Sequence, residues 1–207
     1  MQDLIYIITL VSIGYLLGSL NTALIVSKLY GINIREHGSK TAGLTNTYRV
    51  MGKVAAFYVL LGDVLKGVIA SVIGLAIGMF FFTDPFMHSV SLLAAGVGAI
   101  IGHNWPLYFN FKGGKGALTS FAVLCMADWK IGLICITIFI LITLTTRYVS
   151  LATITATTIA AILSCLPVFD HTPYFSLLIC VMALVIIIKH RSNIKRLLKG
   201  QENRISV

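Results

Sequence analysis

Long apolar runs, separated by short polar segments, occupy most of the 207-residue sequence. An α-helix crosses the hydrocarbon core of a bilayer, which is roughly 30 Å thick, with about 20 apolar residues. The pattern therefore predicts seven transmembrane helices, at residues 4–27, 54–82, 86–108, 115–129, 131–146, 150–169 and 174–189. The fourth is the weakest, because only about a dozen uninterrupted apolar residues separate Lys115 from Asp128. Such a short span is tolerated if flanking side chains snorkel or the bilayer thins locally. We expect an all-α integral membrane protein in which residues 1–207 form a single transmembrane domain.

The amino-acid composition excludes a soluble domain. The chain is 57% hydrophobic and 11% charged, whereas a soluble domain carries about 25% charged residues. The net charge of +9 does not indicate a nucleic-acid partner, because the basic residues stand between the apolar runs and not on one soluble face. The four cysteines lie in apolar segments without a CxxC motif or a paired histidine: Cys125, Cys135, Cys165 and Cys180. We interpret them as small buried side chains, and we expect no metal site, no disulfide framework and no cofactor.

The positive charges fall on one side of a seven-helix arrangement. One set of loops holds Lys28, Arg35, Lys40, Arg49, Lys53, Lys112, Lys115, Arg147 and the basic C-terminal segment. The other side holds Lys130, together with Asp3, Asp84, Asp128 and Asp170. Cytoplasmic loops of membrane proteins carry an excess of Lys and Arg. We therefore expect the N-terminus outside, the C-terminus in the cytoplasm, and a multi-pass protein of the cell inner (cytoplasmic) membrane.

Two features lie inside the predicted spans. Two glycine pairs have the GxxxG spacing that lets helices approach closely, Gly14 with Gly18 and Gly74 with Gly78. We interpret both pairs as packing sites. Asp63 and Lys66 stand one turn apart in the second span, where charged side chains are energetically expensive. We expect them to face the bundle interior and to pair with each other or with loop groups, and we favour a structural pair over a contribution to substrate binding.

The first candidate site is the segment from Gly38 to Arg49, Gly-Ser-Lys-Thr-Ala-Gly-Leu-Thr-Asn-Thr-Tyr-Arg, directly before the second span. Small residues and hydroxyls near the start of a helix suit an oxyanion, because backbone N–H groups can approach it closely. Arg49 can direct two parallel N–H groups at a phosphate. The same segment also fits a glycine-containing loop that caps the span with Ser, Thr or Asn, and the local sequence does not decide between the two interpretations.

The second candidate site follows the third span. It consists of Gly102-His103-Asn104-Trp105-Pro106 and of Phe111-Lys112-Gly113-Gly114-Lys115-Gly116. Three glycines among two lysines make a backbone that can wrap around a phosphate. The segment is not a Walker A loop, because the upstream glycine is missing at position 109 and Gly116 replaces the Ser or Thr that binds magnesium. The alternative is a flexible positive-inside turn; we favour phosphate binding, since a plain turn has no need of three glycines among cations.

The third candidate site is the basic segment from His190 to Glu202. On a helix its residues fall on two faces, one with His190, Asn193 and Leu197 and the other with Arg191, Lys195 and Lys199. A cationic face is typical of a helix that lies on anionic lipid headgroups, and we assign the lysines to this contact. His190 and Asn193 point away from the cationic face and remain candidates for a site.

These three blocks, in this order, resemble the bacterial acyl-phosphate-dependent glycerol-3-phosphate acyltransferase family, which makes lysophosphatidic acid at the start of phospholipid synthesis. The resemblance covers nearly the whole chain, and its most specific block is the Phe-Lys-Gly-Gly-Lys-Gly run after Gly-His. The other matching positions are Gly18-Ser19, Gly38-Ser39, Thr45-Asn46, Arg49, Asp63, Lys66-Gly67, Pro106, Arg147 to Ala152, His190, Asn193, Arg196-Leu197-Leu198, Gly200 and Glu202.

The resemblance implies a seven-helix fold with its site at the cytoplasmic membrane surface. It also implies transfer of a fatty acyl group from acyl phosphate to the 1-hydroxyl of glycerol 3-phosphate, without an enzyme-bound acyl intermediate. Catalytic roles fall to Ser39, Arg49, Lys112, His190 and Asn193. Substrate-binding roles fall to Gly38, Asn46, His103, Gly113, Gly114, Lys115 and Gly116. The expected partners are glycerol 3-phosphate, a fatty acyl phosphate and membrane lipid.

The first loop departs from the family pattern, which usually reads Gly-Ser-Gly-Asn before Gly-Ala-Thr-Asn. Here Lys40, Thr41 and Leu44 replace the Gly, the Asn and the Ala. A lysine adopts a positive φ only at a steric cost. An ordinary backbone conformation at position 40 would keep the enzyme active, whereas a strained one would point the backbone donors away from the phosphate. We expect retained activity, because Ser39, Asn46 and Arg49 keep the spacing of the family.

Other classes of protein fit the sequence less well. An acyl-CoA-type acyltransferase uses a His-x4-Asp dyad, and none of the five histidines has an Asp separated from it by four residues. Asp63 is the only acid deep in a predicted span, which is little for a proton-driven transporter. The main alternative is a non-catalytic or transport paralogue that binds phosphate-bearing anions. A transporter needs a cationic path to the outer face, where the sequence places Lys130 alone, so the charges favour the enzyme.

Overall fold

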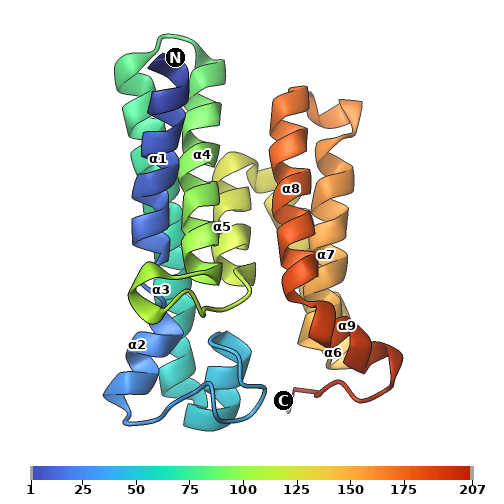
Figure 1. Ribbon diagram of the computed structural model, residues 1–207. Helices are drawn as coiled ribbons and strands as arrows, with labels where there is room; N and C mark the ends of the chain where they lie inside the picture. Colours follow the sequence, from blue (N-terminus) through green and yellow to red (C-terminus); the bar gives the residue numbers. More distant parts are fainter. Residues whose placement is uncertain (1, 206–207) are drawn as a thin grey trace. The chain divides into compact units, whose positions relative to one another are not determined.

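The computed structural model describes residues 2–205, which form helices and connecting loops without a β-strand (Figure 1). The helices are α1 (Gln2–Gly18), α2 (Thr22–Leu29), α3 (Leu44–Phe81), α4 (Pro85–Asn104), α5 (Ala117–Ala127), α6 (Trp129–Thr146), α7 (Val149–Ser164), α8 (Pro173–Lys189) and α9 (Arg191–Leu198), with short 3-10 turns η1 (Leu107–Phe109) and η2 (Pro167–Phe169). A helix occupies each of the seven segments that the apolar pattern predicts.

The helices differ in whether they are long enough to cross a bilayer. In the described part of the chain, four segments have the required length and hydropathy: Leu4–Leu29, Leu44–Phe81, Pro85–Phe109 and Trp129–Thr146. The pair α8 and α9, bent by 59°, makes a fifth if it is counted as one span. The helices α5 and α7 are also apolar, but they have only 11 and 16 residues. At 1.5 Å per residue, α5 covers roughly 17 Å, so seven full crossings stay a prediction.

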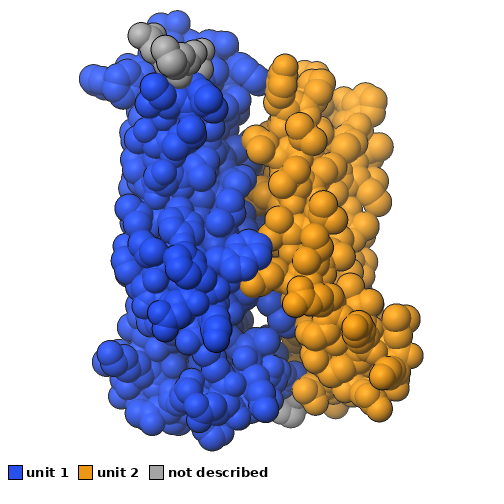
Figure 2. Space-filling view, viewed as in Figure 1, with its two compact units in different colours: residues 1–127 blue, residues 128–207 orange. Residues whose placement is uncertain are grey.

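The chain divides into two compact units, Met1–Ala127 and Asp128–Val207 (Figure 2). The first unit contains α1 to α5, and the second contains α6 to α9. Each unit buries its own apolar and small side chains between its helices.

Small residues bring α1 and α4 into close contact in the first unit, where the two helices lie side by side (Figure 1). A side chain on Gly14 or Gly18 of α1 would collide with the backbone of α4 at Ala95 and Ala99. The contact is reciprocal, because Gly98 and Gly102 of α4 face the α1 backbone at Val11 and Tyr15 in the same way. Gly74 and Gly78 of α3 pack against Ser91 of α4. The predicted role of both GxxxG pairs in close packing is confirmed.

One helix break interrupts a predicted span, and a second lies just before one. The span expected at residues 4–27 is broken, because α1 ends at Gly18 and α2 starts at Thr22. The buried side chain of Asn21 causes the restart by accepting a hydrogen bond from the backbone N–H of Leu24, which caps α2. In α3, Gly52 has φ 82° and ψ −172° and separates a first helical part, residues 44–51, from the long part that follows. A glycine tolerates this conformation, which other residues rarely adopt.

In the second unit, α6, α7 and α8 pack in sequence, and Asp128 joins the start of α6 to the α7–α8 connection. Its carboxylate caps α6 and lies 2.9 Å from His171 Nε2. The His171 ring in turn stacks between Phe169 and Phe175.

The prediction that all four cysteines are buried is wrong, because only Cys135 is fully buried and Cys165 is exposed. Apolar residues on the outside of a membrane helix contact lipid, so an apolar segment does not by itself imply burial in protein.

Candidate functional site

The first loop, residues 30–43, is organised by the side chain of Asn46 in the first turn of α3. This side chain is 1% exposed. Its amide nitrogen donates to the carbonyl oxygens of Ile34, His37 and Thr41, at 3.1–3.2 Å. Its oxygen accepts from the backbone N–H of Ser39 at 2.8 Å. Asn46, predicted as a substrate-binding residue, therefore shapes the loop from inside.

Ser39 is half-buried and lies between the exposed residues Gly38 and Lys40 of this loop. The Ser39 hydroxyl lies 2.8 Å from the Thr41 hydroxyl, so Thr41 replaces the family's Asn with a different hydrogen-bonding partner. Gly38 and Lys40 both have φ 57°. Of the two alternatives for position 40, the structure has the strained, left-handed conformation, which a glycine adopts freely. Lys40 therefore keeps the backbone conformation of the glycine that the family pattern has at this position.

The second loop, residues 105–116, connects α4 to α5 and contains the lysine–glycine run. It folds back on the end of α4, where Gly114 N–H donates to the His103 carbonyl at 3.1 Å. A side chain on Gly113 would collide with that carbonyl, and Gly116 has φ 77°. The three glycines are therefore required by close approach and by backbone conformation. The side chain of Lys112 is exposed and that of Lys115 is half-buried.

The two loops contact each other within the first unit. The Arg35 guanidinium donates to the carbonyl oxygens of Phe109, at 3.2 Å, and of Lys112. A side chain on Gly114 would collide with the Ala42 carbonyl, so the two backbones lie against each other at this point. Partial burial lowers the pKa of the Arg35 guanidinium, which nevertheless stays charged at neutral pH. Sequence reasoning assigned Arg35 to membrane orientation alone; its position seven residues upstream of Ala42 carried no signal of this second role.

Arg49 lies in the first part of α3, three residues after Asn46 and therefore on a neighbouring position of the same helical face. Its side chain is exposed. The kink at Gly52 follows directly, so this arginine belongs to a short helix with its own direction and not to the long membrane helix. The structure thus groups Ser39 and Arg49 with the first loop, and it joins this loop to the loop of Lys112 and Lys115.

A buried polar cluster lies beneath the second loop. Asp63 and Lys66 of α3 form the expected ion pair, with Oδ1 and Nζ 2.9 Å apart. The Lys66 ammonium also lies 2.8 Å from Nδ1 of His103, at the end of α4. His103, predicted as a substrate-binding residue, is 3% exposed and contacts the ion pair from below the loop.

In the second unit, the C-terminal segment, residues 190–205, folds around the carboxylate of Glu202. Asn193 Nδ2 and the Ser150 hydroxyl donate to Oε1 of Glu202, at 2.7 and 2.9 Å. Arg196 Nε donates to Oε2 at 2.7 Å. Burial would raise the pKa of Glu202, but the hydrogen bonds from Asn193, Arg196 and Ser150 outweigh it and hold the pKa below its ordinary value. The sequence identified Glu202 only as a position that matches the family. Its central place depends on contacts with residues 52 and 9 positions away, which the sequence does not reveal.

His190 and Asn193, which lie away from the cationic helical face, are both buried. His190 ends α8, and its Nδ1 lies 2.8 Å from the Ile186 carbonyl. A carbonyl oxygen only accepts, so Nδ1 carries the proton and Nε2 is the acceptor of the neutral ring. Arg191, Lys195 and Lys199 are exposed, as a headgroup-facing surface requires. Both candidate residues belong to the second unit, whereas Ser39, Arg49 and Lys112 belong to the first.

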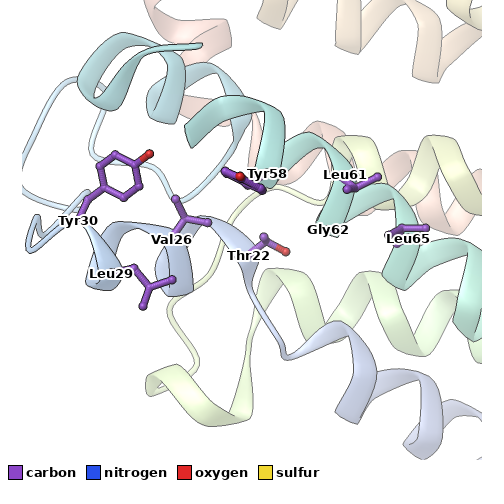
Figure 3. A pocket seen from close by; sticks show the side chains of 8 residues that line it. All are labelled: Thr22, Val26, Leu29, Tyr30, Tyr58, Leu61, Gly62 and Leu65. Carbon is purple, nitrogen blue, oxygen red and sulfur yellow. The ribbon is translucent and has the colours of Figure 1, made fainter. Parts of the chain in front are cut away.

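An apolar groove of about 370 Å³ runs between α2 and α3 (Figure 3). It is lined by Thr22, Val26, Leu29, Tyr30, Tyr58, Leu61, Gly62 and Leu65. Thr22 of α2 and Gly62 of α3 approach each other closely along it. Tyr30, at the end opposite Leu65 (Figure 3), is the first residue of the first loop, so the groove leads from the apolar side of α3 to this loop.

These features define a helical membrane protein with two joined, cationic, glycine-rich loops of the kind that bind anions. A sequence profile of the family described as glycerol-3-phosphate acyltransferase matches residues 8–200. The chain therefore belongs to the glycerol-3-phosphate acyltransferase family, as the resemblance of its motifs indicates.

Individual relatives agree with the profile over nearly the whole chain. The proteins named glycerol-3-phosphate acyltransferase of Thermoanaerobacter sp. (strain X514) and of Halalkalibacterium halodurans are 38% and 40% identical to it, over 97% and 93% of this chain and 96% and 92% of theirs. The crystal structure of PlsY (YgiH), an integral membrane glycerol 3-phosphate acyltransferase, in its glycerol 3-phosphate form has a TM-score of 0.84 and 36% identity, covering 97% of this chain and 96% of that one. Its lysophosphatidic acid form has a TM-score of 0.80 and 34% identity, covering 97% and 95%.

Proposed function

We propose that this chain transfers a fatty acyl group from acyl phosphate to the 1-hydroxyl of glycerol 3-phosphate and releases lysophosphatidic acid and inorganic phosphate. This reaction serves phospholipid biosynthesis. The observation that carries the proposal is the junction of the two loops in a membrane protein of this family. Both substrates carry a phosphate, and the two loops, which the Arg35 side chain joins, both carry cations. The acyl chain is apolar, which suits a site next to the bilayer.

The reaction needs positioning and charge neutralisation more than a protein nucleophile. The 1-hydroxyl oxygen attacks the acyl carbonyl carbon, the new ester C–O bond forms, and the bond between that carbon and the phosphate oxygen breaks. Phosphate leaves with the bonding electrons, and a substrate phosphate takes the hydroxyl proton. An acyl phosphate is already activated, so holding both substrates in line and stabilising the developing negative charge account for catalysis.

The roles of the loop residues follow from their charge and exposure. Arg49 and Lys112, both exposed, bind substrate phosphate directly, and half-buried Lys115 adds positive potential from within the second loop. The Ser39 hydroxyl, held by Thr41, orients a substrate oxygen. The glycines Gly38, Gly113, Gly114 and Gly116, predicted as substrate-binding residues, allow the tight packing that holds the loop cations in place, and Asn46 and His103 support the two loops from inside. The proposal keeps His190, with its acceptor Nε2, and Asn193, with its amide group, as catalytic residues of the second unit.

The membrane arrangement belongs to the same proposal. The seven predicted spans cross the cell inner membrane with the N-terminus outside and the C-terminus in the cytoplasm. This orientation puts both loops and the basic C-terminal segment on the cytoplasmic side, where Lys and Arg are in excess. The fatty acyl phosphate reaches the first loop from the bilayer, and the apolar groove between α2 and α3 accommodates its chain.

The experiment compares loop cations with headgroup-facing cations. Arg49→Ala and Lys112→Ala should each lower kcat/KM for lysophosphatidic acid formation by roughly 10- to 100-fold or more, because loss of a hydrogen bond to a charged group costs about 1.5–3 kcal/mol. Lys195→Ala and Lys199→Ala remove the same charge from an exposed helix surface and should change the rate little in detergent. Equal losses in all four variants would contradict the separate roles. No product from glycerol 3-phosphate and acyl phosphate in the native protein would contradict the proposed reaction.

A further inference from the structure

The polar cluster beneath the second loop is as deeply buried as the apolar core around it. Asp63, Lys66 and His103 are 1%, 6% and 3% exposed. Buried charges are stable only when they are paired and hydrogen-bonded. Asp63 and Lys66 balance each other, so the cluster as a whole is neutral if the imidazole of His103 is neutral.

The contacts of Nδ1 define the protonation of His103. The Lys66 ammonium has no acceptor, so its contact with Nδ1 at 2.8 Å is a hydrogen bond only if Nδ1 accepts. The competing contact, from Nδ1 to the Asp63 carboxylate, is 3.5 Å long. The shorter contact, with Lys66, therefore determines the protonation of the ring. A neutral imidazole with an accepting Nδ1 carries its proton on Nε2, so Nε2–H is a hydrogen-bond donor.

Nε2 lies at the junction of the two loops. A side chain on Gly114 would collide with His103 Nε2 and also with the Ala42 carbonyl oxygen, so both atoms face the same small space around the Gly114 Cα. The His103 carbonyl accepts from Gly114 N–H in addition. One residue thus touches the second loop through its backbone and its ring, at the point where that loop meets the first.

The cluster is also tied to the helix ends around it. Lys66 Nζ lies 3.4 Å from the Leu20 carbonyl, in the break between α1 and α2. The Thr119 hydroxyl donates to the Asp63 carbonyl at 3.1 Å, which fixes the start of α5. The cluster therefore connects the loop junction to α3, to the α1–α2 break and to α5.

We propose that Asp63 and Lys66 hold His103 in the Nε2–H tautomer, and that His103 acts as a positioning residue that sets the contact between the first and the second loop. His103 does not touch substrate in this account, and the intramembrane ion pair acts on the reaction through it. The kinetic readout rests on the proposed function, whereas the tautomer does not.

The kinetic test uses two amides that imitate opposite ends of the imidazole. In His103→Gln the side-chain nitrogen reaches the position of Nε2, and in His103→Asn it reaches only that of Nδ1. We expect His103→Gln to keep kcat/KM within a few-fold of native, and His103→Asn to lose roughly 10- to 100-fold, mainly through a higher KM for glycerol 3-phosphate. Equal activity of the two variants, with equal thermal stability, would overturn the positioning role, because a purely structural residue does not distinguish the two ends of the ring.

The spectroscopic test needs no turnover. In ¹⁵N-histidine-labelled native protein, the His103 signal, assigned by its absence in His103→Gln, should show an unprotonated Nδ1 and a protonated Nε2. The double variant Asp63→Asn, Lys66→Met leaves no lone buried charge and should convert this signal to a mixture of tautomers. A native Nδ1–H tautomer or an imidazolium, or a signal that the double variant leaves unchanged, would overturn the proposal. If the native protein lacked acyltransferase activity but showed the expected tautomer, the proposed function would fail and the tautomer assignment would stand.

Discussion

At the scale of single residues, Lys40 shows how the first loop tolerates a departure from its family pattern. The loop backbone keeps φ 57° at this position, although the residue is a lysine. A left-handed conformation costs a non-glycine residue roughly 1–2 kcal/mol. The side chain is exposed, so the strain is confined to the backbone. The loop geometry is thus that of a glycine, with an added cation beside Ser39.

Replacing the two unusual residues should therefore change stability more than turnover. Lys40→Gly relieves the left-handed strain but loosens the unfolded chain, for a net gain of roughly 0.5–1 kcal/mol in unfolding free energy. In the double variant Lys40→Gly, Thr41→Asn, we expect kcat within a few-fold of native. We also expect a higher KM for glycerol 3-phosphate, because a cation has been removed from the first loop. Thermal unfolding and initial rates of product formation measure both effects. A native protein without turnover that these two changes switch on would identify the chain as a binding paralogue.

Residue types alone predicted the charged loops but not the supporting contacts. Ser39, Arg49 and the lysines of the second loop were named because hydroxyls and cations near glycines suit phosphate. The bridging role of Arg35 was missed, because a basic loop residue in a membrane protein is first explained by orientation. The role of His103 was assigned to substrate, since a histidine beside a glycine loop does not reveal whether its ring faces outward or inward.

At the scale of helices, hydropathy predicted the existence of the elements and local chemistry determined their ends. The break after Gly18 lies within apolar sequence, where a hydropathy window shows no boundary, whereas the kink at Gly52 lies two residues before the predicted start of a span at residue 54. The cap by Asn21 and the positive φ of Gly52 are readable only once the helix positions are known. The GxxxG pairs, in contrast, were predicted correctly, because close helix packing depends on residue size and spacing alone.

The C-terminal segment should come loose in acid. Because Glu202 has a lowered pKa in the folded protein, its contribution to stability is present above its unfolded pKa of about 4.3 and is lost as pH falls through the lower folded value. Hydrogen exchange of residues 191–205 should show protection at pH 7 that disappears in this acid range. Glu202→Gln should lack the protection at both pH values, whereas Glu36→Gln, an exposed carboxyl of the first loop, should behave as native. Unchanged protection in Glu202→Gln would contradict the anchoring role.

At the scale of the whole molecule, the proposed function depends on which side of the membrane carries the loops. Tyr108→Cys, in the second loop, should be labelled in intact cells only by reagents that cross the membrane. Thr83→Cys, between α3 and α4, should react with impermeant reagents from outside. Both positions are exposed, and both variants are made in a chain whose exposed Cys165 is replaced by alanine. The reverse labelling pattern would overturn the orientation that the positive charges predict.

The central claim is that the two loops handle two phosphate-bearing substrates, and donor choice tests it most directly. The measurement is the initial rate of lysophosphatidic acid formation by the purified native protein from glycerol 3-phosphate, with either acyl phosphate or acyl-CoA as the donor and with a metal chelator present. We predict turnover with acyl phosphate and none with acyl-CoA, because the chain lacks a His-x4-Asp dyad and combines cations with glycine-rich backbone at the loop junction. Equal or faster turnover with acyl-CoA would contradict the account.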